Sequence, residues 1–287
     1  MMKRITSLAL LFALALLSVR AQDLATLLLE LDQCVEQKER HRLPRRQRID
    51  SLRLELSSAH EQEFNHLYKE LYQNYSHFRT DSALFFLDCM SETPETKADV
   101  ALQTTVELDR AEQLAIMGAY SDAENIVKKL STCQMTDKKQ RTHYFHVCRT
   151  IYGWMGDYMN DTPTLAEVFR NKTHLYRDSI ISTEENEISR DVVRADYLLA
   201  EGNADEAKRI LEMRMEQAKN EQKSYVYFIL SEVYRQLNRP EQQMRHLTLA
   251  AIEDLKRGVT EYAALPMLAN LLMDRDDVER ADRKSVV

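Results

Sequence analysis

The chain has 287 residues, of which 44% are hydrophobic and 30% charged, so it can bury a sizeable core and is not globally disordered. Gly and Pro occur only five times each, which disfavours a sheet protein with many tight turns and favours an all-α fold. The net charge of −7 disfavours broad electrostatic binding to nucleic acid, so we expect this segment to bind none.

The chain begins with a short basic segment, MMKR, followed by the apolar run ITSLALLFALALLSV. Val19 and Ala21 are small enough for the −3 and −1 positions of a signal peptidase site, so residues 1–21 are predicted to be a secretory signal peptide. A retained membrane anchor is the alternative, although the run is short for a bilayer span. No Cys lies at the cleavage point, which disfavours a lipoprotein that captures glycans at the outer membrane.

Four cysteines follow the predicted signal peptide, and no C-x-x-C pair occurs, so neither a thioredoxin-like nor a zinc-ribbon site is supported. Burial as small apolar residues in helices is one interpretation of these cysteines, and disulfides in an oxidising compartment are the other. They are Cys34, Cys89, Cys133 and Cys148.

Residues 22–60 are predicted to form an N-terminal helical segment that Pro44 breaks. A basic cluster surrounds the proline. It is interpreted as a solvated helix face and turn, with contact to an anionic lipid surface or an acidic partner as the alternative. The cluster consists of Arg40, His41, Arg42, Arg45, Arg46 and Arg48.

Residues 61–281 are predicted to form a domain of repeated helical hairpins. The stretches RAEQLAIMGAYSDAENIVKKL and RADYLLAEGNADEAKRILEMR align without gaps, and LSEVYRQLNRPEQQMRHLTLA and LANLLMDRDDVERA follow the same plan. Small residues at two aligned positions let antiparallel helices cross closely, and Gly or Asn at the turn between them supplies a left-handed helix cap. The predicted repeat-packing residues are Ala111, Gly118, Ala123, Ala195, Gly202, Ala207, Ser231, Ala269 and Ala281.

Looser copies of the pattern are centred on Ala83 and Ala166, and Gln243 departs from the small-residue rule, so irregular packing is expected there. Small residues flanking a turn are typical of tetratricopeptide repeats, although the period here is longer than the usual one. The predicted fold class is therefore all-α, a tetratricopeptide-like helical-hairpin repeat solenoid. Such arrays present an extended concave face that suits a protein or peptide partner, or a small ligand.

The stretch YGWMGDYMNDTP contains the only Trp of the chain and two glycines that are expected to interrupt a helix. Tyr152, Trp154 and Tyr158 are the candidate ligand-binding residues, as an aromatic patch on the concave face. The alternative is that Trp154 anchors the core where the repeat is irregular.

The stretch HYFHVC places His143 and His146 on one helical face, but Cys148 points elsewhere, so helix surface and core are favoured over a metal site. No H-E-x-x-H, Gly-rich phosphate loop or G-x-S-x-G motif occurs, and no carboxylate pair suggests a raised pKa. We therefore expect a non-enzymatic protein with no cofactor and no catalytic or metal site.

Several stretches resemble a family of tetratricopeptide-like proteins from Bacteroides-type bacteria that carries a domain of unknown function. They are Arg48–Leu52 (RIDSL), Asp81–Ala83 (DSA), Ala251-Ile252 with Asp254, and Ala263, Leu265, Ala269, Leu271 and Leu272. The resemblance implies a periplasmic sensor that continues, past the repeats, into a transmembrane helix, a coiled coil and a cytoplasmic helix-turn-helix region. It thereby implies inner-membrane attachment and a homodimer of the full-length protein, and it supplies no catalytic residues.

The chain ends in Asp282-Arg283-Lys284-Ser285-Val286-Val287, the translation of a widely used sequencing adapter read in frame. Residues 282–287 are therefore predicted to be an artefact, with a natural polar helix end as the alternative. Two functions remain open. The chain is the sensor region of a transmembrane regulator whose effector half is missing, or it is a stand-alone periplasmic adaptor that holds protein partners.

Overall fold

The computed structural model describes residues 24–274, apart from positions 131, 133, 134, 136, 160 and 260–262. The regular structure of this part of the chain is helical, and no strand occurs in it. The prediction of an all-α helical-hairpin fold is thereby confirmed. Residues 1–21, Cys133, Ala281 and residues 282–287, on which other predictions fall, lie outside the described residues.

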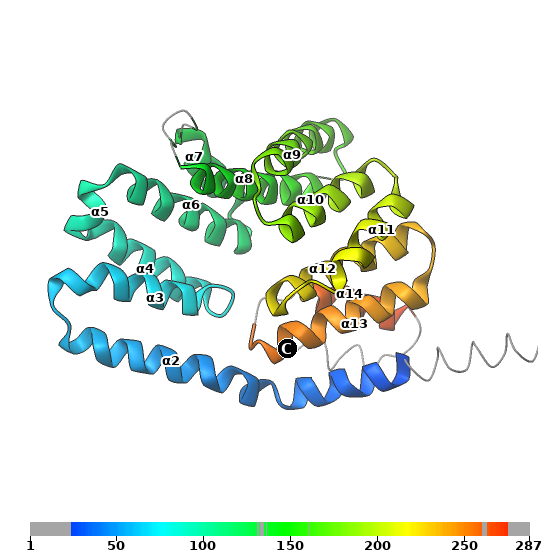
Figure 1. Cartoon of the computed structure of the whole chain (residues 1–287), viewed down its shortest axis with the longest axis horizontal. Coiled ribbons are helices and arrows are strands. Elements are labelled where there is room, and N and C mark those ends of the chain that lie inside the picture. The colour runs from blue at the N-terminus through cyan, green and yellow to red at the C-terminus, as the bar shows by residue number, and fades with distance from the viewer. Residues whose placement is uncertain are drawn as a thin grey trace, which may run out of the picture. The chain divides into compact units, whose positions relative to one another are not determined.

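The helices follow one another as hairpins joined by short turns (Figure 1). Residues 24–36 form the first described helix. It is followed by α2 (Lys38–Ser58), a short 3₁₀ turn (Glu61–Glu63), α3 (Phe64–Tyr75), α4 (Thr80–Glu92), α5 (Pro94–Ala98), α6 (Val100–Ile116), α7 (Tyr120–Lys129), α8 (Lys138–Tyr158), α9 (Pro163–Thr183), α10 (Glu187–Ala200), α11 (Ala204–Met215), α12 (Asn220–Gln236), α13 (Pro240–Lys256) and α14 (Ala264–Met273).

The chain divides into two compact units. Unit 1 combines residues 1–41 with residues 218–287, and unit 2 comprises residues 42–217. The division falls inside α2, so the N-terminal segment expected at residues 22–60 contributes to both units.

Unit 2 is built from four hairpins, in which α3 packs on α4, α6 on α7, α8 on α9 and α10 on α11. Successive hairpins also contact each other, for example through α6 and α8. Figure 1 shows α7 and α9 on the outer side of the curve that these hairpins follow, with α6 and α10 on its inner side. The first helices α6 and α10 therefore lie on the inner side of this curve.

Small residues predicted from the repeat are buried, as expected where two helices cross closely. Ala111 and Ala123 of the α6–α7 hairpin, and Ala195 and Ala207 of the α10–α11 hairpin, have no exposed surface. In unit 1, Ser231 is also fully buried and Ala269 is 6% exposed. A longer side chain at such a crossing would push the helices apart, because interiors are close-packed.

Two turns between paired helices of unit 2, α6–α7 and α10–α11, share one left-handed cap. Gly118 has φ +83° and Gly202 has φ +78°, which are conformations that glycine adopts at little cost. The next residue then donates its N–H back across the turn, from Ala119 to the Leu114 carbonyl at 2.9 Å and from Asn203 to the Leu198 carbonyl at 2.8 Å. This pattern satisfies carbonyl groups that the helix end would leave without partners.

Two expected helix breaks are wrong. The helix α2 continues from Lys38 to Ser58 with Pro44 inside it. Proline removes one backbone N–H and strains the preceding turn, but residues on both sides here still favour the helix. Likewise, α8 runs without interruption through Gly153 and Gly156. A Cβ on Gly156 would lie 3.5 Å from the Phe169 Cβ, an ordinary van der Waals contact.

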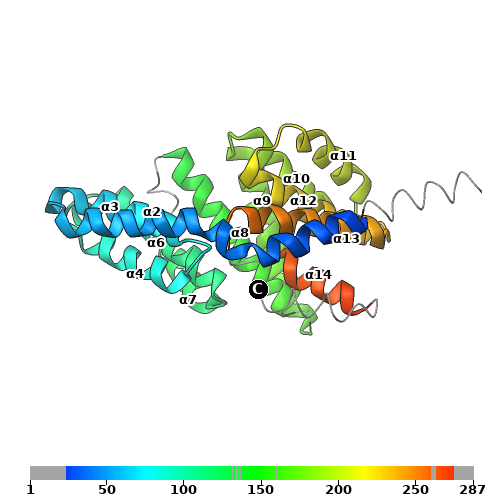
Figure 2. The same cartoon turned by 90° about the horizontal axis from the view of Figure 1, so that it is seen from below.

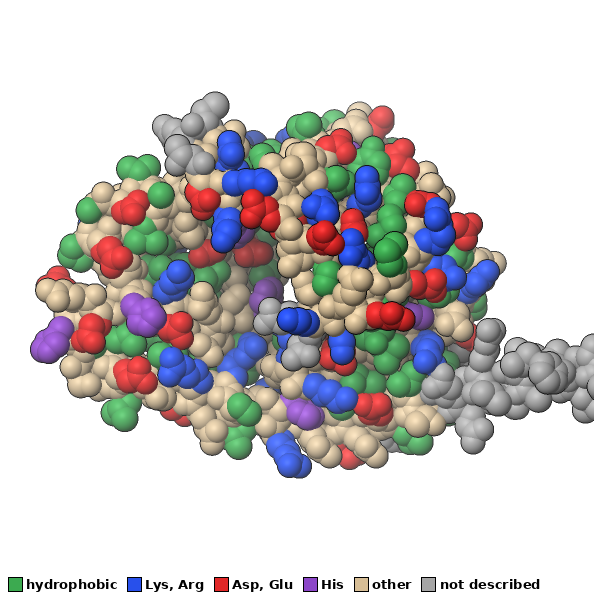
Figure 3. All heavy atoms as spheres, viewed as in Figure 1, with side chains coloured by type: hydrophobic (Ala, Val, Ile, Leu, Met, Phe, Trp, Pro, Cys, Tyr) green, Lys and Arg blue, Asp and Glu red, His purple; other side chains and the backbone are tan. Residues whose placement is uncertain are grey.

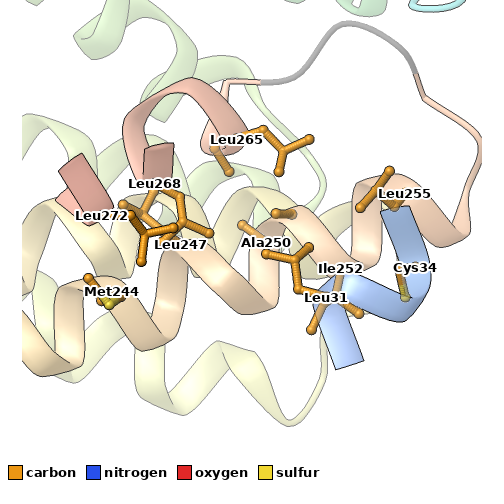
Figure 4. Close-up of a cluster of buried hydrophobic side chains, with 12 residues drawn as sticks. Leu31, Cys34, Met244, Leu247, Ala250, Ile252, Leu255, Leu265, Leu268 and Leu272 are labelled. Atoms are coloured by element: carbon orange, nitrogen blue, oxygen red, sulfur yellow. The ribbon is translucent and has the colours of Figure 1, made fainter. Parts of the chain in front are cut away.

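Unit 1 joins the N-terminal helix of residues 24–36 to α12, α13 and α14, as Figure 2 shows for the pairing with α13. Leu31 and Cys34 pack with Leu255 and other apolar residues of α13 and α14 (Figure 4). At the edge of this core, the Lys256 ammonium lies 2.8 Å from the Glu30 carboxylate. The N-terminal helix thus covers apolar surface of the last described hairpin.

Cys34 and Cys148 are buried and Cys89 is partly buried, and no two of these three are bonded to each other. Burial raises the pKa of the Cys148 thiol to about 11, which favours the neutral, unreactive form.

No helix in the described part of the chain is both long and apolar enough to span a bilayer.

Candidate functional site on the first helices of unit 2

A cavity of about 580 Å³ opens on unit 2, between the first helices α6 and α8 and the turn that joins α9 to α10. Its walls carry charged and hydroxyl-bearing side chains rather than aromatic ones. The lining residues are Glu112, Lys138, Lys139, Thr142, His143, His146, Arg149, Thr150, Thr183, Glu184, Glu185 and Asn186.

Helix periodicity explains why α8 supplies most of this lining. Lys139, Thr142, His146 and Arg149 recur at intervals of three or four residues, so they share one face of the helix. Asp137 caps the start of α8, because its carboxylate accepts the Lys139 N–H at 3.2 Å. The opposite face carries Tyr144, Cys148 and Tyr152 into the core.

An ion pair and a hydrogen bond join the turn between α9 and α10 to α8. Lys138 Nζ lies 3.0 Å from Glu185 Oε1, and His146 Nε2 lies 3.2 Å from Glu184 Oε2. Burial lowers the pKa of His146 and nearby Arg149 adds to this, so the attraction of Glu184 does not restore the ordinary value. His146 is therefore mainly neutral at pH 7 and acts as a hydrogen-bond partner of Glu184.

On one side of the cavity, two arginines contact the same carboxylate. Asp196 Oδ2 of α10 lies 3.2 Å from Arg149 Nη1 of α8 and 2.8 Å from Arg177 Nε of α9. All three side chains are less than one-fifth exposed. The arrangement fixes Arg149 in the wall through residues of two further helices.

The other side holds a cluster of Asp109 and Glu112 from α6 and His143 from α8. His143 Nε2 lies 3.7 Å from Asp109 Oδ1 and 3.8 Å from Glu112 Oε2. Burial raises the pKa of Asp109 to about 6, against the lowering effect of His143. Burial opposes the charged form of His143 as well, but the Glu112 and Asp109 carboxylates leave its pKa raised.

The three aromatic residues predicted as a ligand patch do not share a surface. Tyr152 is 4% exposed and stacks in the core, with its ring 5.7 Å from that of Tyr176. Trp154 is 38% exposed and lies beside Tyr120, and Tyr158 is 76% exposed near the end of α8. The spacing explains the separation, because Trp154 and Tyr158 are four residues apart on one helical face while Tyr152 lies on another.

The sequence drew attention to His143 and His146 as a pair, but the structure gives them different partners on different walls. The acidic partners of His143 lie on α6, about one repeat earlier in the chain. Asp109 and Glu112 are three residues apart, which places both on one helical face. That spacing, combined with the repeat alignment, was the available signal for a carboxylate pair with one raised pKa.

The basic cluster of α2 is partly engaged in contacts within unit 2. Arg48 lies 3.3 Å from the Glu70 carboxylate, and the Arg45 guanidinium lies over the Phe78 ring. On the face drawn in Figure 3, acidic, basic and apolar side chains are mixed without a broad area of one sign.

Paired helices, buried small residues at the crossings and left-handed caps at the turns define a tetratricopeptide-type repeat protein, a fold for protein interaction rather than catalysis. The family model described as SusR N-terminal TPR domain matches residues 35–284, and the chain belongs to this family. A search of curated proteins finds no match.

Proposed function

We propose that this chain is the sensor region of a transmembrane signalling or transcription-regulatory protein, and that the unit 2 cavity binds the partner that it senses. The observation that carries the proposal is the cavity of about 580 Å³ between the first helices α6 and α8 and the turn that joins α9 to α10. Membership of a family named for the N-terminal repeats of a regulator supports it.

The lining favours a polar occupant such as a protein or peptide segment. Lys138, Lys139 and Arg149 offer cationic donors, Glu112 and Glu185 offer anionic acceptors, and three threonines add hydroxyl groups. A peptide carries charges of both signs and a backbone that donates and accepts, so it can satisfy such walls. An apolar ligand would leave many of these groups desolvated without a partner.

A pair of charge variants tests the proposal. Lys139→Glu combined with Thr150→Glu places two negative charges in the cavity on side chains that are exposed or partly exposed. Lys129→Glu, at the exposed end of α7, is the control for the lysine reversal because it makes the same Lys→Glu change outside the cavity. Partners are captured by crosslinking from an extract of the source cells, and binding is then measured with purified components.

We expect the cavity variant to weaken binding at least tenfold and the control to leave it within about twofold, with equal melting temperatures for both. Equal binding by both variants would show that the partner binds to a surface outside the cavity.

The proposal includes export to the periplasm and attachment of the full-length protein to the inner membrane. It rests on the signal-peptide pattern of residues 1–21 and on the family resemblance. Cell fractionation together with N-terminal sequencing of the mature protein tests the export, with cleavage expected before Gln22.

Reading the genomic frame past the codon for Ala281 tests whether the chain is part of a transmembrane regulator. An apolar span of about 20 residues followed by a basic helix-turn-helix region is expected, whereas a stop codon after Val287 would favour a stand-alone adaptor.

A further inference from the structure

We propose that Asp109, Glu112 and His143 form a binding site for a divalent transition-metal ion, with Zn²⁺ as the reference ion. The site goes beyond the proposed sensing function and does not depend on it. Two of the ligands come from α6 and the third from α8, so an ion would tie the first helices of two successive hairpins together.

The three side chains converge with the spacing that a small ion requires. One ligand atom from each residue lies within 4.8 Å of the other two. The distances of 3.7 Å and 3.8 Å from His143 Nε2 to the two carboxylates exceed hydrogen-bond length. Ligand atoms around a tetrahedral Zn²⁺ with bonds of about 2.0–2.1 Å lie about 3.3–3.5 Å apart. The two His143 distances would contract by a few tenths of an ångström on binding, and the Asp109 and Glu112 oxygens, which lie within 4.8 Å of each other, would also move together.

The donor set selects the class of ion. One imidazole and two carboxylates suit Zn²⁺ and other divalent transition metals, which accept nitrogen and oxygen donors together. Ca²⁺ requires six to eight oxygen ligands, and Mg²⁺ prefers oxygen in an octahedral shell, so neither matches these three residues. Since only three ligands come from the protein, water or an oxygen of a bound partner would occupy the fourth position.

The surroundings give the ligands fixed positions and the ion a route of entry. The Tyr72 hydroxyl of α3 hydrogen-bonds to the Asp109 carboxylate, in the way that outer groups commonly orient metal ligands. The side chains of Asp109, Glu112 and His143 are 17%, 34% and 30% exposed, so they are not sealed in the core. Glu112 and His143 also line the cavity, which places the open coordination position on its side.

The alternative is that a protonated His143 neutralises part of the negative charge of the Asp109 and Glu112 carboxylates without a metal. That alternative predicts no specific, saturable uptake of Zn²⁺. The pair of His174 and Glu201, whose Nε2 and Oε1 atoms lie 3.8 Å apart, offers a matched control. It has the same two groups at the same distance, and it is not part of the cluster of three ligands.

The experiment measures Zn²⁺ binding by calorimetry on the whole chain, purified without a polyhistidine tag. His143→Gln and Asp109→Asn remove ligands at nearly constant size, Tyr72→Phe removes the orienting hydroxyl, and His174→Gln is the control. We expect one ion per chain, a loss of affinity of at least about a hundredfold for the ligand variants, and a loss of about tenfold for Tyr72→Phe. The His174→Gln protein should bind as the parent does.

Co²⁺ in place of Zn²⁺ distinguishes this site from binding by cysteine. A spectrum typical of nitrogen and oxygen ligands, with no thiolate-to-cobalt charge-transfer band, is expected and should disappear in His143→Gln. Absence of one-to-one binding in the parent, a thiolate band, or equal affinity of the parent and His143→Gln would each overturn the proposal. Circular dichroism of every variant identifies any that fails to fold, in which case the Tyr72→Phe result decides.

Discussion

The two units hold distant parts of the chain together with different side chains. In unit 1, the helix of residues 24–36 joins α13 and α14 through Leu31, Cys34 and surrounding leucines, and its ion pair between Glu30 and Lys256 is nearly half exposed. In unit 2, partly buried charges join helices of successive hairpins, as at Asp196 of α10 with Arg149 of α8 and Arg177 of α9. Apolar burial thus closes unit 1, whereas unit 2 adds ionic contacts around its cavity.

The largest effect is expected from removing the apolar contact that closes unit 1. Leu31 has no exposed surface, so Leu31→Ala should destabilise unit 1 by about 2–5 kcal/mol through lost burial and the cavity left behind. Leu29→Ala is the matched control, because Leu29 is 56% exposed and its truncation should cost less than about 0.5 kcal/mol. Chemical denaturation measures the free energies, and hydrogen exchange in α13 reports which unit opens. Equal costs for the two variants would contradict the packing of this helix on α13.

A smaller effect is expected from removing an ionic contact of unit 2. Asp196→Asn removes the charge that Arg149 and Arg177 both contact, and hydrogen bonds to charged groups contribute about 1.5–3 kcal/mol each in mutational series. A loss of about 2 kcal/mol is expected. Glu30→Gln breaks the exposed pair of unit 1 and should cost less than about 1 kcal/mol. Denaturation at low and high salt measures both, and the unit 2 variant should exceed the unit 1 variant in either condition.

Glycine at a turn and glycine inside a helix should respond to alanine with opposite signs. Gly202 has φ +78°, which an alanine adopts only with strain, so Gly202→Ala should lower the stability of unit 2 by about 1 kcal/mol. Gly153 lies inside α8, and a Cβ there would meet Thr173 Cγ2 at 3.9 Å, an ordinary contact. Gly153→Ala should therefore raise stability by up to about 1 kcal/mol. Shifts of the same sign in thermal unfolding would show that one of these conformations is wrong.

Features that depend on residues close together in the sequence could be predicted from the sequence alone. Small residues at the crossings and Gly at the turns have local spacing, so the hairpins and their pairing could be predicted from one chain. Gln243, which departs from the small-residue pattern, is nevertheless 6% exposed in α13. A repeat alignment shows that such a position is buried, but it does not show how neighbouring side chains make room for an amide.

The cavity and its charges depended on contacts between repeats, which periodicity does not reveal. His143 and His146 belong to one face of α8, yet their pKa values shift in opposite directions. Against the effect of burial, the Glu112 and Asp109 carboxylates leave the pKa of His143 raised, whereas burial and Arg149 lower that of His146. The aromatic patch was mispredicted for a related reason. Tyr152, Trp154 and Tyr158 are close in sequence, but helical rotation places Tyr152 in the core and Tyr158 in solvent.

The smallest effect is expected at a turn that occurs in both units, where unit 1 has asparagine and unit 2 has glycine. Asn238 has φ +52° in the turn between α12 and α13, where unit 2 uses Gly118 and Gly202 at the corresponding turns. Its backbone hydrogen bonds match those turns, since the Arg239 N–H donates to the Tyr234 carbonyl at 2.8 Å. Asparagine tolerates the left-handed region better than other non-glycine residues, so the strain to be relieved is small. Asn238→Gly should therefore stabilise unit 1 by only a few tenths of a kcal/mol, because greater freedom of the unfolded chain offsets part of the gain. Asn238→Ala, which keeps the strain without the side-chain amide, should instead cost about 1 kcal/mol. Thermal unfolding of the three proteins should rank Gly above Asn and Asn above Ala, and a stabilising alanine would mean that this turn is not left-handed.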